Sequence, residues 1–180
     1  RTIFHYVAIQ SNPVYIKTLQ TCIESKTTTF EVNVNMKDIN GITPLMLALR
    51  IDTIQRLIEL GADPFLLDTQ GRDIIVYILL NSALIARSLL EYILSKFPDL
   101  AQSSIVQFIK FQQIDLRCLE TLIKYKFNIN QRDQYGNTLL HKLAKDDDGD
   151  IDLIINVISH GADPYSTNIY GTKPVHIMLQ

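Results

Sequence analysis

The sequence has few of the features that would indicate a disulfide framework or a nucleic-acid partner. Its two cysteines, Cys22 and Cys118, lie far apart without CxxC spacing, and we expect reduced thiols on buried helix faces. Lys and Arg number 17 against 19 Asp and Glu, so the net charge is −2 and there is no basic excess to neutralise a phosphate backbone. We therefore expect a reducing compartment and no nucleic-acid partner.

A long apolar run is also missing. The longest apolar region, residues 74–86, is interrupted by Asn81 and Ser82, and it is too short and too polar to cross a bilayer. A pair of buried helices explains this region better. We expect no direct membrane insertion and a cytoplasmic location, which would be the host cytosol if the chain belongs to a secreted effector. Because the chain begins at Arg1 rather than Met, we also expect it to be a segment of a longer protein.

The motifs of several large enzyme classes are absent, namely GxSxG, the P-loop, HExxH and GxGxxG. The acidic run KDDDGDID at 145–152 invites comparison with a calcium-binding loop, but Ile151 and Val157 stand where an EF-hand needs Gly and Glu. Cys118 lies in an amphipathic stretch with no group that would activate its thiol. We predict no enzymatic activity, no cofactor and no metal site.

What the sequence does contain is an internal repeat. The segment GADPFLLDTQGRD at 61–73 has a counterpart in GADPYSTNIYGTK at 161–173. Turn glycines recur about 30 to 35 residues apart, with one interval of about twice that length. These glycines are Gly41, Gly71, Gly136 and Gly171. Such a period is typical of a solenoid of stacked repeats.

The residues around each glycine predict a turn, a helix, a loop and a second helix. Glycine permits the positive φ of the turn, and Thr43, Asp73 and Thr138 can cap the helix that follows. Gly61 and Gly161 can end the second helices. Amphipathic stretches stand at the second-helix positions 53–64, 86–99, 116–130 and 151–164. We predict first helices that begin near Thr2, Thr43, Asp73, Ser103, Thr138 and Lys173.

The pattern Asp-x-x-Gly-x-Thr-Pro-Leu at 38–45, followed by Ala48 and by a second helix that ends in Gly-Ala-Asp, resembles the ankyrin repeat. The resemblance covers nearly the whole chain. It implies an all-α ankyrin-repeat solenoid of about five helix-turn-helix units with short hairpin turns between repeats, in a single domain 1–180. The approximate units are 1–36, 37–66, 67–100, 101–130, 131–164 and a partial C-terminal unit, 165–180.

Two details of the sequence follow from this alignment. In the unit 101–130 the glycine and the cap are lost, and KFNIN at 126–130 stands where a Gly-Ala-Asp loop would lie. His5, His141 and His176 match the histidine of the family's Thr-Pro-Leu-His motif, which implies hydrogen bonds to neighbouring backbone rather than a metal site.

Helical periodicity predicts which apolar side chains form the core. The residues expected to be buried are Leu45, Ala48, Leu57 and Ile58 in one unit, and Leu140, Leu143, Ile154 and Ile158 in another.

In ankyrin arrays the hairpin tips and the exposed faces of the first helices form a concave surface, so the resemblance implies partner contacts there. The alternative is that these tips are merely solvated turns. Apolar and aromatic residues at the tips, Ile39, Ile42, Tyr135, Ile169 and Tyr170, argue against that alternative. The transferred positions are Lys37, Ile39, Asn40, Ile42, Arg50, Leu67, Thr69, Gln70, Arg72, Asn81, Arg132, Gln134, Tyr135, Asn137, Lys145, Ile169, Tyr170 and Thr172.

The resemblance implies a non-enzymatic protein–protein interaction module, a scaffold or adaptor that binds a protein partner through its concave face and is monomeric as an isolated domain. An alternative is the substrate-recruiting arm of a larger enzyme or pathogen effector whose catalytic domain lies outside this segment. A third possibility is a spacer between other domains, with no partner on the concave face. The repeat scaffold does not specify which protein is bound.

Overall fold

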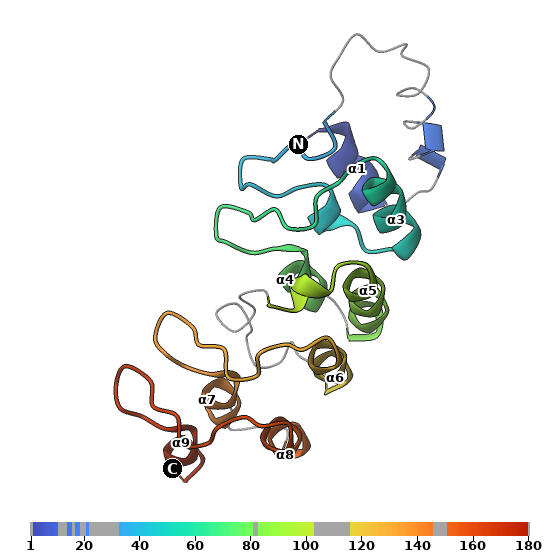
Figure 1. Cartoon of the computed structure of the whole chain (residues 1–180). Coiled ribbons are helices and arrows are strands. Elements are labelled where there is room, and N and C mark those ends of the chain that lie inside the picture. Colours follow the sequence, from blue (N-terminus) through green and yellow to red (C-terminus); the bar gives the residue numbers. More distant parts are fainter. Residues whose placement is uncertain are drawn as a thin grey trace. The chain divides into compact units, whose positions relative to one another are not determined.

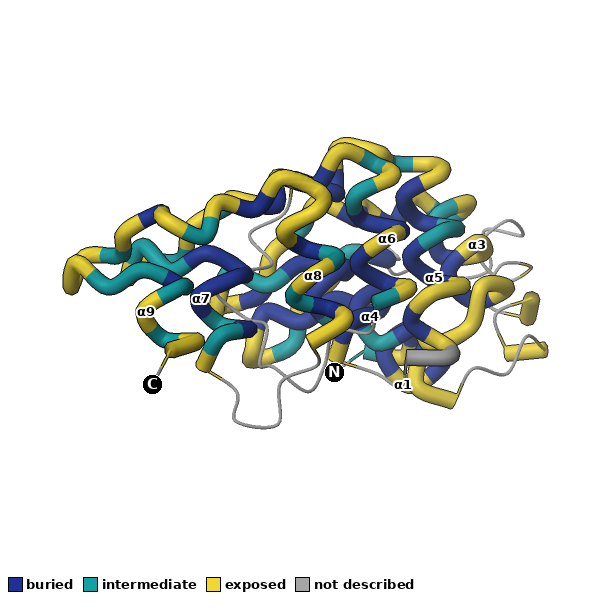
Figure 2. Tube along the Cα trace, turned by 90° about the horizontal axis from the view of Figure 1, so that it is seen from below, coloured by how far each residue is buried: buried dark blue, intermediate teal, exposed yellow. Residues whose placement is uncertain are grey.

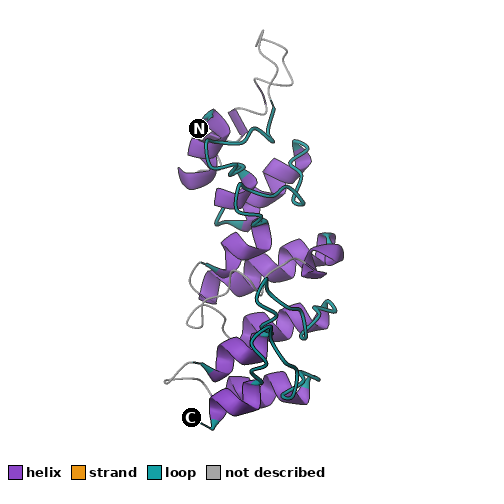
Figure 3. Cartoon of the chain, turned by 90° about the vertical axis from the view of Figure 1, so that its left-hand side faces the viewer, coloured by secondary structure: helices purple, strands orange, loops and turns teal. Residues whose placement is uncertain are grey.

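The structure is a computed structural model that describes residues 2–10, 14–15, 17–18, 21, 33–80, 83–102, 116–145 and 151–179. Within these ranges every regular element is a helix and there is no strand, which confirms the all-α prediction (Figure 3). The elements are α1 (Ile3–Gln10), η1 (Leu45–Leu47), α3 (Ile51–Glu59), α4 (Ile74–Leu79), α5 (Ala83–Lys96), η2 (Pro98–Gln102), α6 (Leu116–Lys124), α7 (Leu139–Ala144), α8 (Ile151–Ser159) and α9 (Pro174–Met178), where η marks a 3-10 helix.

The chain forms two compact units, Arg1–Ile78 and Leu79–Gln180. In the first unit, α1 and α3 both pack against η1. In the second unit, α5 packs against α6 and η2, while α7 packs against both α8 and α9 (Figure 1). Hairpin loops lead into α7 and α9 and project on the same side of these helices (Figure 1). Assignment of 1–180 to a single domain remains a prediction.

The predicted helix starts are confirmed at four places. α1, α4, α7 and α9 begin one residue after Thr2, Asp73, Thr138 and Lys173. Asp73 caps α4 because its Oδ1 accepts hydrogen bonds from the backbone N–H groups of Ile75 (2.9 Å) and Val76 (3.2 Å). The start predicted near Ser103 lies outside the described residues.

The helix predicted after Thr43 is shorter than expected, because the structure has only the 3-10 turn η1 there. Three residues separate η1 from α3, whereas 145–150 separate α7 from α8. The chain must reverse within this short connection, so Ala48 already has an extended backbone (φ −78°, ψ 121°) and the last turn of a full helix has no room to form.

The core prediction is confirmed for Leu45, Ala48 and Leu57, and for Leu140 and Leu143, all of which are buried. It is wrong for three isoleucines of the second helices. Ile58 and Ile154 are half-buried, and Ile158 is 39% exposed.

Each of the second helices α3 and α8 buries fewer apolar residues than its sequence contains. In α3 the buried residues are Thr53, Ile54 and Leu57, and in α8 they are Leu153 and Val157. Each residue rotates the helix by about 100°. An isoleucine one position beyond the buried Leu57 or Val157 therefore points to the flank. Figure 2 shows this alternation of buried and exposed positions along α8.

The loop at 126–130 has the geometry of the two Gly-Ala-Asp loops, as the alignment predicts. Gly61 and Gly161 have left-handed backbones (φ 88° and 92°), and Lys126 takes the equivalent position with φ 66°. The next residue closes the loop in each case: the N–H of Ala62 donates to Leu57 O at 2.9 Å, and that of Phe127 donates to Leu122 O at 3.0 Å.

Replacing Leu140 with alanine should lower the free energy of unfolding by about 2–5 kcal/mol, because its side chain is fully buried in α7 and leaves a cavity. Denaturant unfolding of the full chain measures this loss. Ile155→Ala, on the exposed side of α8, is the matched control and should change the free energy by less than about 0.5 kcal/mol. Equal losses in the two variants would contradict the assigned helix faces.

Lys126→Gly should raise the free energy of unfolding by about 0.5–1 kcal/mol. A side chain is strained at φ 66°, and glycine relieves this strain while leaving the loop's backbone hydrogen bonds intact. The control Arg87→Gly replaces an exposed cation in the interior of α5, so it should instead cost about 0.5–1 kcal/mol. Destabilisation by Lys126→Gly would show that the loop is not held in this conformation.

Candidate functional site

Each hairpin tip is built around one Asp or Asn side chain. The Oδ1 of Asp38, Asp68, Asp133 or Asn168 accepts hydrogen bonds from the backbone N–H groups two and four residues later, at 2.8–3.1 Å. Such Asx turns hold the tip in one conformation without help from the side chains at its crest. These positions were not singled out in the sequence, although the Asp-x-x-Gly spacing contains the signal.

Backbone hydrogen bonds join successive hairpins within each compact unit. Thr69 N donates to Asn40 O in the first unit, and Ile169 N donates to Tyr135 O in the second, both at 3.0 Å. The hairpins approach so closely that a Cβ on Gly41 would lie 2.7 Å from Thr69 N. Since Gly41 also has φ 75°, no other residue fits this position without moving the neighbouring hairpin.

A cation just before each of two tips braces the next hairpin. Lys37 Nζ donates to Leu67 O, and Arg132 Nη1 donates to Thr167 O, both at 2.7 Å. Both residues were predicted to contact a partner, and both side chains are exposed. Their charged groups therefore already take part in stacking the hairpins.

Two asparagines fix the loops that precede the hairpins. Asn130 donates through Nδ2 to Gly161 O and accepts through Oδ1 from Asp163 N, both at 2.9 Å. Asn35 makes the same pair of bonds to Gly61 O (2.9 Å) and Asp63 N (2.8 Å). Sequence reasoning missed this role, which the recurring Asn-x-Asn of 33–35 and 128–130 could have indicated.

His141 links its own repeat to the next through both ring nitrogens. The backbone N–H of Thr138 donates to Nδ1 at 3.1 Å, so that nitrogen is unprotonated and Nε2 carries the proton. Nε2 lies 3.1 Å from Thr172 O, to which it donates. His5 makes the equivalent contacts with Thr2 and with Ile42 O, at 2.8 Å. The contacts implied for the two histidines by their motif are thus present.

Arg72, predicted to contact a partner, is held inside its own repeat. Its Nε donates to Asp68 Oδ2 at 2.7 Å, its Nη2 donates to Tyr77 Oη at 3.0 Å, and the guanidinium lies over the Tyr77 ring. Burial opposes ionisation of Asp68, but the hydrogen bonds from backbone, Arg72 and Tyr77 outweigh it and lower the pKa of this carboxyl. Burial and the Asp68 contact raise the pKa of Tyr77 to about 12.

One predicted contact residue is misplaced. Ile42 is only 8% exposed, so it is not an apolar residue of the tip. Its N–H donates to Asp38 Oδ1 (3.1 Å), and its carbonyl oxygen accepts from His5 Nε2 (2.8 Å). These two bonds hold Ile42 at the end of the hairpin, where the chain enters the helices. Asn81 lies outside the described residues.

The other predicted residues divide by exposure. Half-buried positions are Arg72, Asn137 and Thr172. Exposed positions are Lys37, Ile39, Asn40, Arg50, Leu67, Thr69 and Gln70 in the first compact unit, and Arg132, Gln134, Tyr135, Lys145, Ile169 and Tyr170 in the second.

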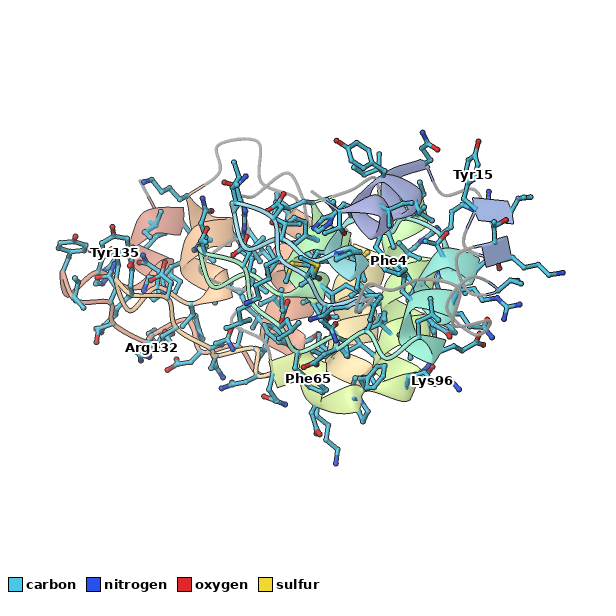
Figure 4. All side chains as sticks on the ribbon, turned by 90° about the horizontal axis from the view of Figure 1, so that it is seen from above. Phe4, Tyr15, Phe65, Lys96, Arg132 and Tyr135 are labelled. Atoms are coloured by element: carbon cyan, nitrogen blue, oxygen red, sulfur yellow. The ribbon has the colours of Figure 1, made fainter. Side chains whose placement is uncertain are left out.

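In the second compact unit, a pocket of about 330 Å³ opens beside the exposed tip residues. Its wall includes Asn137, Lys142 and Lys145 from one repeat and Asn168 and Tyr170 from the next. Lys142 Nζ lies 3.5 Å from Asp133 Oδ2. Burial lowers the pKa of Lys142, and the neighbouring Asp133 partly offsets this effect. Arg132 and Tyr135 project from the adjoining hairpin, as Figure 4 shows.

The family model named Ankyrin repeat matches residues 40–69. These residues contain the first GADP loop and both partners of the hairpin bond from Thr69 to Asn40. Residues 40–69 are thus an ankyrin repeat, and the chain has the ankyrin-repeat fold.

Solved structures share the ankyrin-repeat fold over nearly the full chain. An ankyrin repeat domain from Acinetobacter baumannii AYE matches with a TM-score of 0.70 and 21% identity, covering 97% of this chain and 88% of that one. The ankyrin repeat protein EF0377 matches with a TM-score of 0.63 and 18% identity over 93% of this chain and 88% of that one.

A third similar chain belongs to the complex of the predatory endopeptidase Bd0816 from Bdellovibrio bacteriovorus with the immunity protein Bd3460. Its TM-score is 0.69 at 20% identity, and the match covers 99% of this chain and 91% of that one. No curated protein matches the chain by sequence. None of the helices in the described ranges has the length and apolar character needed to span a membrane.

Stability should fall below about pH 6.5 partly through His141. Burial lowers the pKa of this imidazole from 6.5, so the unfolded state binds a proton more readily than the folded ankyrin repeat does. At pH values above the pKa of His141 in the unfolded state, this residue makes its full contribution to the free energy of unfolding. The contribution is lost as the pH falls toward the pKa of His141 in the folded state, with a slope of up to about 1.4 kcal/mol per pH unit.

Unfolding free energies of the parent and His141→Gln, measured from pH 8 to pH 5, test this expectation. The variant should be less stable at pH 8, and its stability should depend less on pH. Parallel curves for the two proteins would contradict it.

Proposed function

We propose that this chain is a non-enzymatic interaction module that binds a protein partner through its hairpin tips and the adjoining faces of its first helices. The observation that carries the proposal is the exposure of apolar side chains at the outer ends of the rigid hairpin tips. Ile39 is 93% exposed and Tyr170 is 71% exposed, and Tyr135 and Ile169 are exposed as well. Exposed tyrosines near an arginine, as at Arg132, are typical of interface hot spots.

The construction of the tips supports binding rather than a merely solvated turn. Asx turns, the hairpin-to-hairpin bonds and the Arg132 brace fix the backbone before any partner arrives. A surface that is already ordered loses little conformational entropy on association, so more of the contact energy appears as affinity. The crest side chains are therefore free to vary with the partner.

The similar solved structures favour a binding role over catalysis. Two of them are named as ankyrin repeat proteins or domains, and a third belongs to a complex between an endopeptidase and an immunity protein. For this chain we propose a protein partner, a cytoplasmic location and a monomeric isolated domain. The alternative is that the array recruits substrates for a catalytic domain of a larger enzyme or pathogen effector. A full-length sequence with such a domain would favour that alternative.

Tyr135→Ala combined with Tyr170→Ala should weaken partner binding at least tenfold, because truncating an aromatic anchor at an interface commonly costs about 2 kcal/mol or more. The melting temperature should stay nearly unchanged, since both rings are exposed. Proteins captured from cell lysate by the full chain and by the variant would be compared by quantitative mass spectrometry, and the depleted proteins would then be titrated directly.

The matched control is Ile151→Ala combined with Ile155→Ala, which removes two exposed apolar side chains from α8, away from the tips. This control should capture the same proteins as the parent. Loss of the same proteins from the control but not from the tip variant would place the interface on α8 and contradict the proposal.

A further inference from the structure

The C-terminal first helix, α9, leaves open a position that other repeats cover. Five residues after each predicted start of a first helix stands an apolar residue, and in four repeats it is at most 6% exposed. These residues are Val7, Ala48, Ile78 and Leu143. In α9 the equivalent Met178 is 36% exposed, and the next residue, Leu179, is 81% exposed. α9 packs against α7 at the end of the second compact unit, without the cover that α8 gives to α7 (Figure 1).

His176 in α9 also differs from its counterparts in other repeats. His5 Nε2 lies 2.8 Å from Ile42 O of the following repeat. His141 Nε2 lies 3.1 Å from Thr172 O of the following repeat, and both rings are buried. His176 occupies the equivalent position, but it is exposed and its ring has no hydrogen-bond partner among the described residues. The contact that the motif implies for His176 is therefore absent, and the carbonyl of a following repeat would restore it.

The hairpin that leads into α9 has an open edge with the features of a stacking edge. In the preceding hairpin, Tyr135 O accepts a hydrogen bond of 3.0 Å from the next hairpin, and a Cβ on Gly136 would lie 3.3 Å from the backbone of Asn168. The equivalent carbonyl, Tyr170 O, accepts no hydrogen bond within the described part of the chain. A Cβ on Gly171 would meet none of the described residues within 4 Å, yet Gly171 keeps a positive φ of 72°.

This edge does not fit a second copy of itself, because its donors are already engaged. The N–H of Ile169 donates to Tyr135 O. The N–H groups of Tyr170 and Gly171 both donate to Asn168, through its Oδ1 and its backbone carbonyl. All three bonds measure 3.0 Å. Two copies that met through this edge would thus present two acceptors and no donor, whereas the hairpin of a further repeat supplies the donor.

We propose that this end of the second compact unit is a stacking surface for a further ankyrin repeat, formed by polypeptide that continues after Gln180. A helix placed against α9 as α8 is against α7 covers Met178. The hairpin after that helix donates to Tyr170 O and accepts from His176 Nε2. A repeat that closes an array needs a polar outer face, and the exposed Met178 and Leu179 make this one apolar.

The inference is independent of the proposed partner. Tyr135 stays 46% exposed although the next hairpin already stacks on its own, so stacking on the last hairpin leaves the Tyr170 ring available at the tip.

The sequence of the full-length protein gives the first test. We expect an amphipathic stretch soon after Gln180 and a turn glycine about 30 to 35 residues after Gly171, which is the period of the other repeats. A polypeptide that ends at Gln180, or that continues as a polar segment without this pattern, would overturn the inference.

Thiol labelling tests the packing itself. Met178→Cys is made in the 180-residue chain and in the full-length protein, with the natural cysteines replaced by alanine in both, and the reaction with a maleimide is timed. The thiol should react at least tenfold more slowly in the full-length protein, because the equivalent Leu143 is only 2% exposed. Ile155→Cys on α8 is the matched control. Its equivalents in α3 and α6, Gln55 and Glu120, are exposed, so this thiol should react alike in both proteins.

The imidazole of His176 gives a readout that needs no substitution. Its Nε2–H signal should exchange slowly with water in the full-length protein and rapidly in the 180-residue chain, because a hydrogen-bonded N–H is protected from exchange. Equal labelling of Met178→Cys in the two proteins, together with rapid exchange at His176 in both, would overturn the inference. Labelling of the 180-residue chain that slows with its own concentration, or on addition of a captured protein, would assign the surface to a second copy or to a separate partner and would contradict it as well.

Discussion

The hydrogen bond between successive hairpins is the contact on which the rest of the structure depends. It joins Thr69 N to Asn40 O in one compact unit and Ile169 N to Tyr135 O in the other. It requires a tip glycine, because a Cβ on Gly41 would collide with Thr69 N, and it requires an Asx turn to aim the carbonyl. His141 then fastens the helices beneath the hairpins by donating to Thr172 O of the next repeat.

These contacts divide the polar residues into two groups with different roles. Buried ones, such as His141, Asp68 and Asp133, bind backbone and fix one repeat against the next. Ile39 and Ile169 have no side-chain hydrogen-bonding group, and the rings of Tyr135 and Tyr170 are exposed, so the fold does not require these residue types at the tips. Exposed tyrosines and isoleucines on a crest that does not need them are therefore more informative about function than any buried residue.

The sequence predicted the parts of the fold that depend on local chemistry. Asp73 and Thr138 mark helix starts, and Leu140 lies in the core, because capping and helical periodicity act within a few residues. Ile158 was placed wrongly because the rotation of a helix is decided by what packs against it. Ile42 was placed wrongly because a histidine from the preceding repeat, 37 residues earlier, holds its carbonyl. The tip contacts remain predictions, since exposure shows which side chains can meet a partner but not which do.

Hydroxyl-radical footprinting of the full chain, with and without a protein that it captures, tests most directly whether the tips are the binding surface. Tyrosine rings are oxidised in proportion to their exposure, so they report contact at single positions. The proposed interface predicts that Tyr135 and Tyr170 become protected on binding while the half-buried Tyr125, which follows α6, is oxidised as before. Protection of Tyr125 with Tyr135 and Tyr170 unchanged would contradict it.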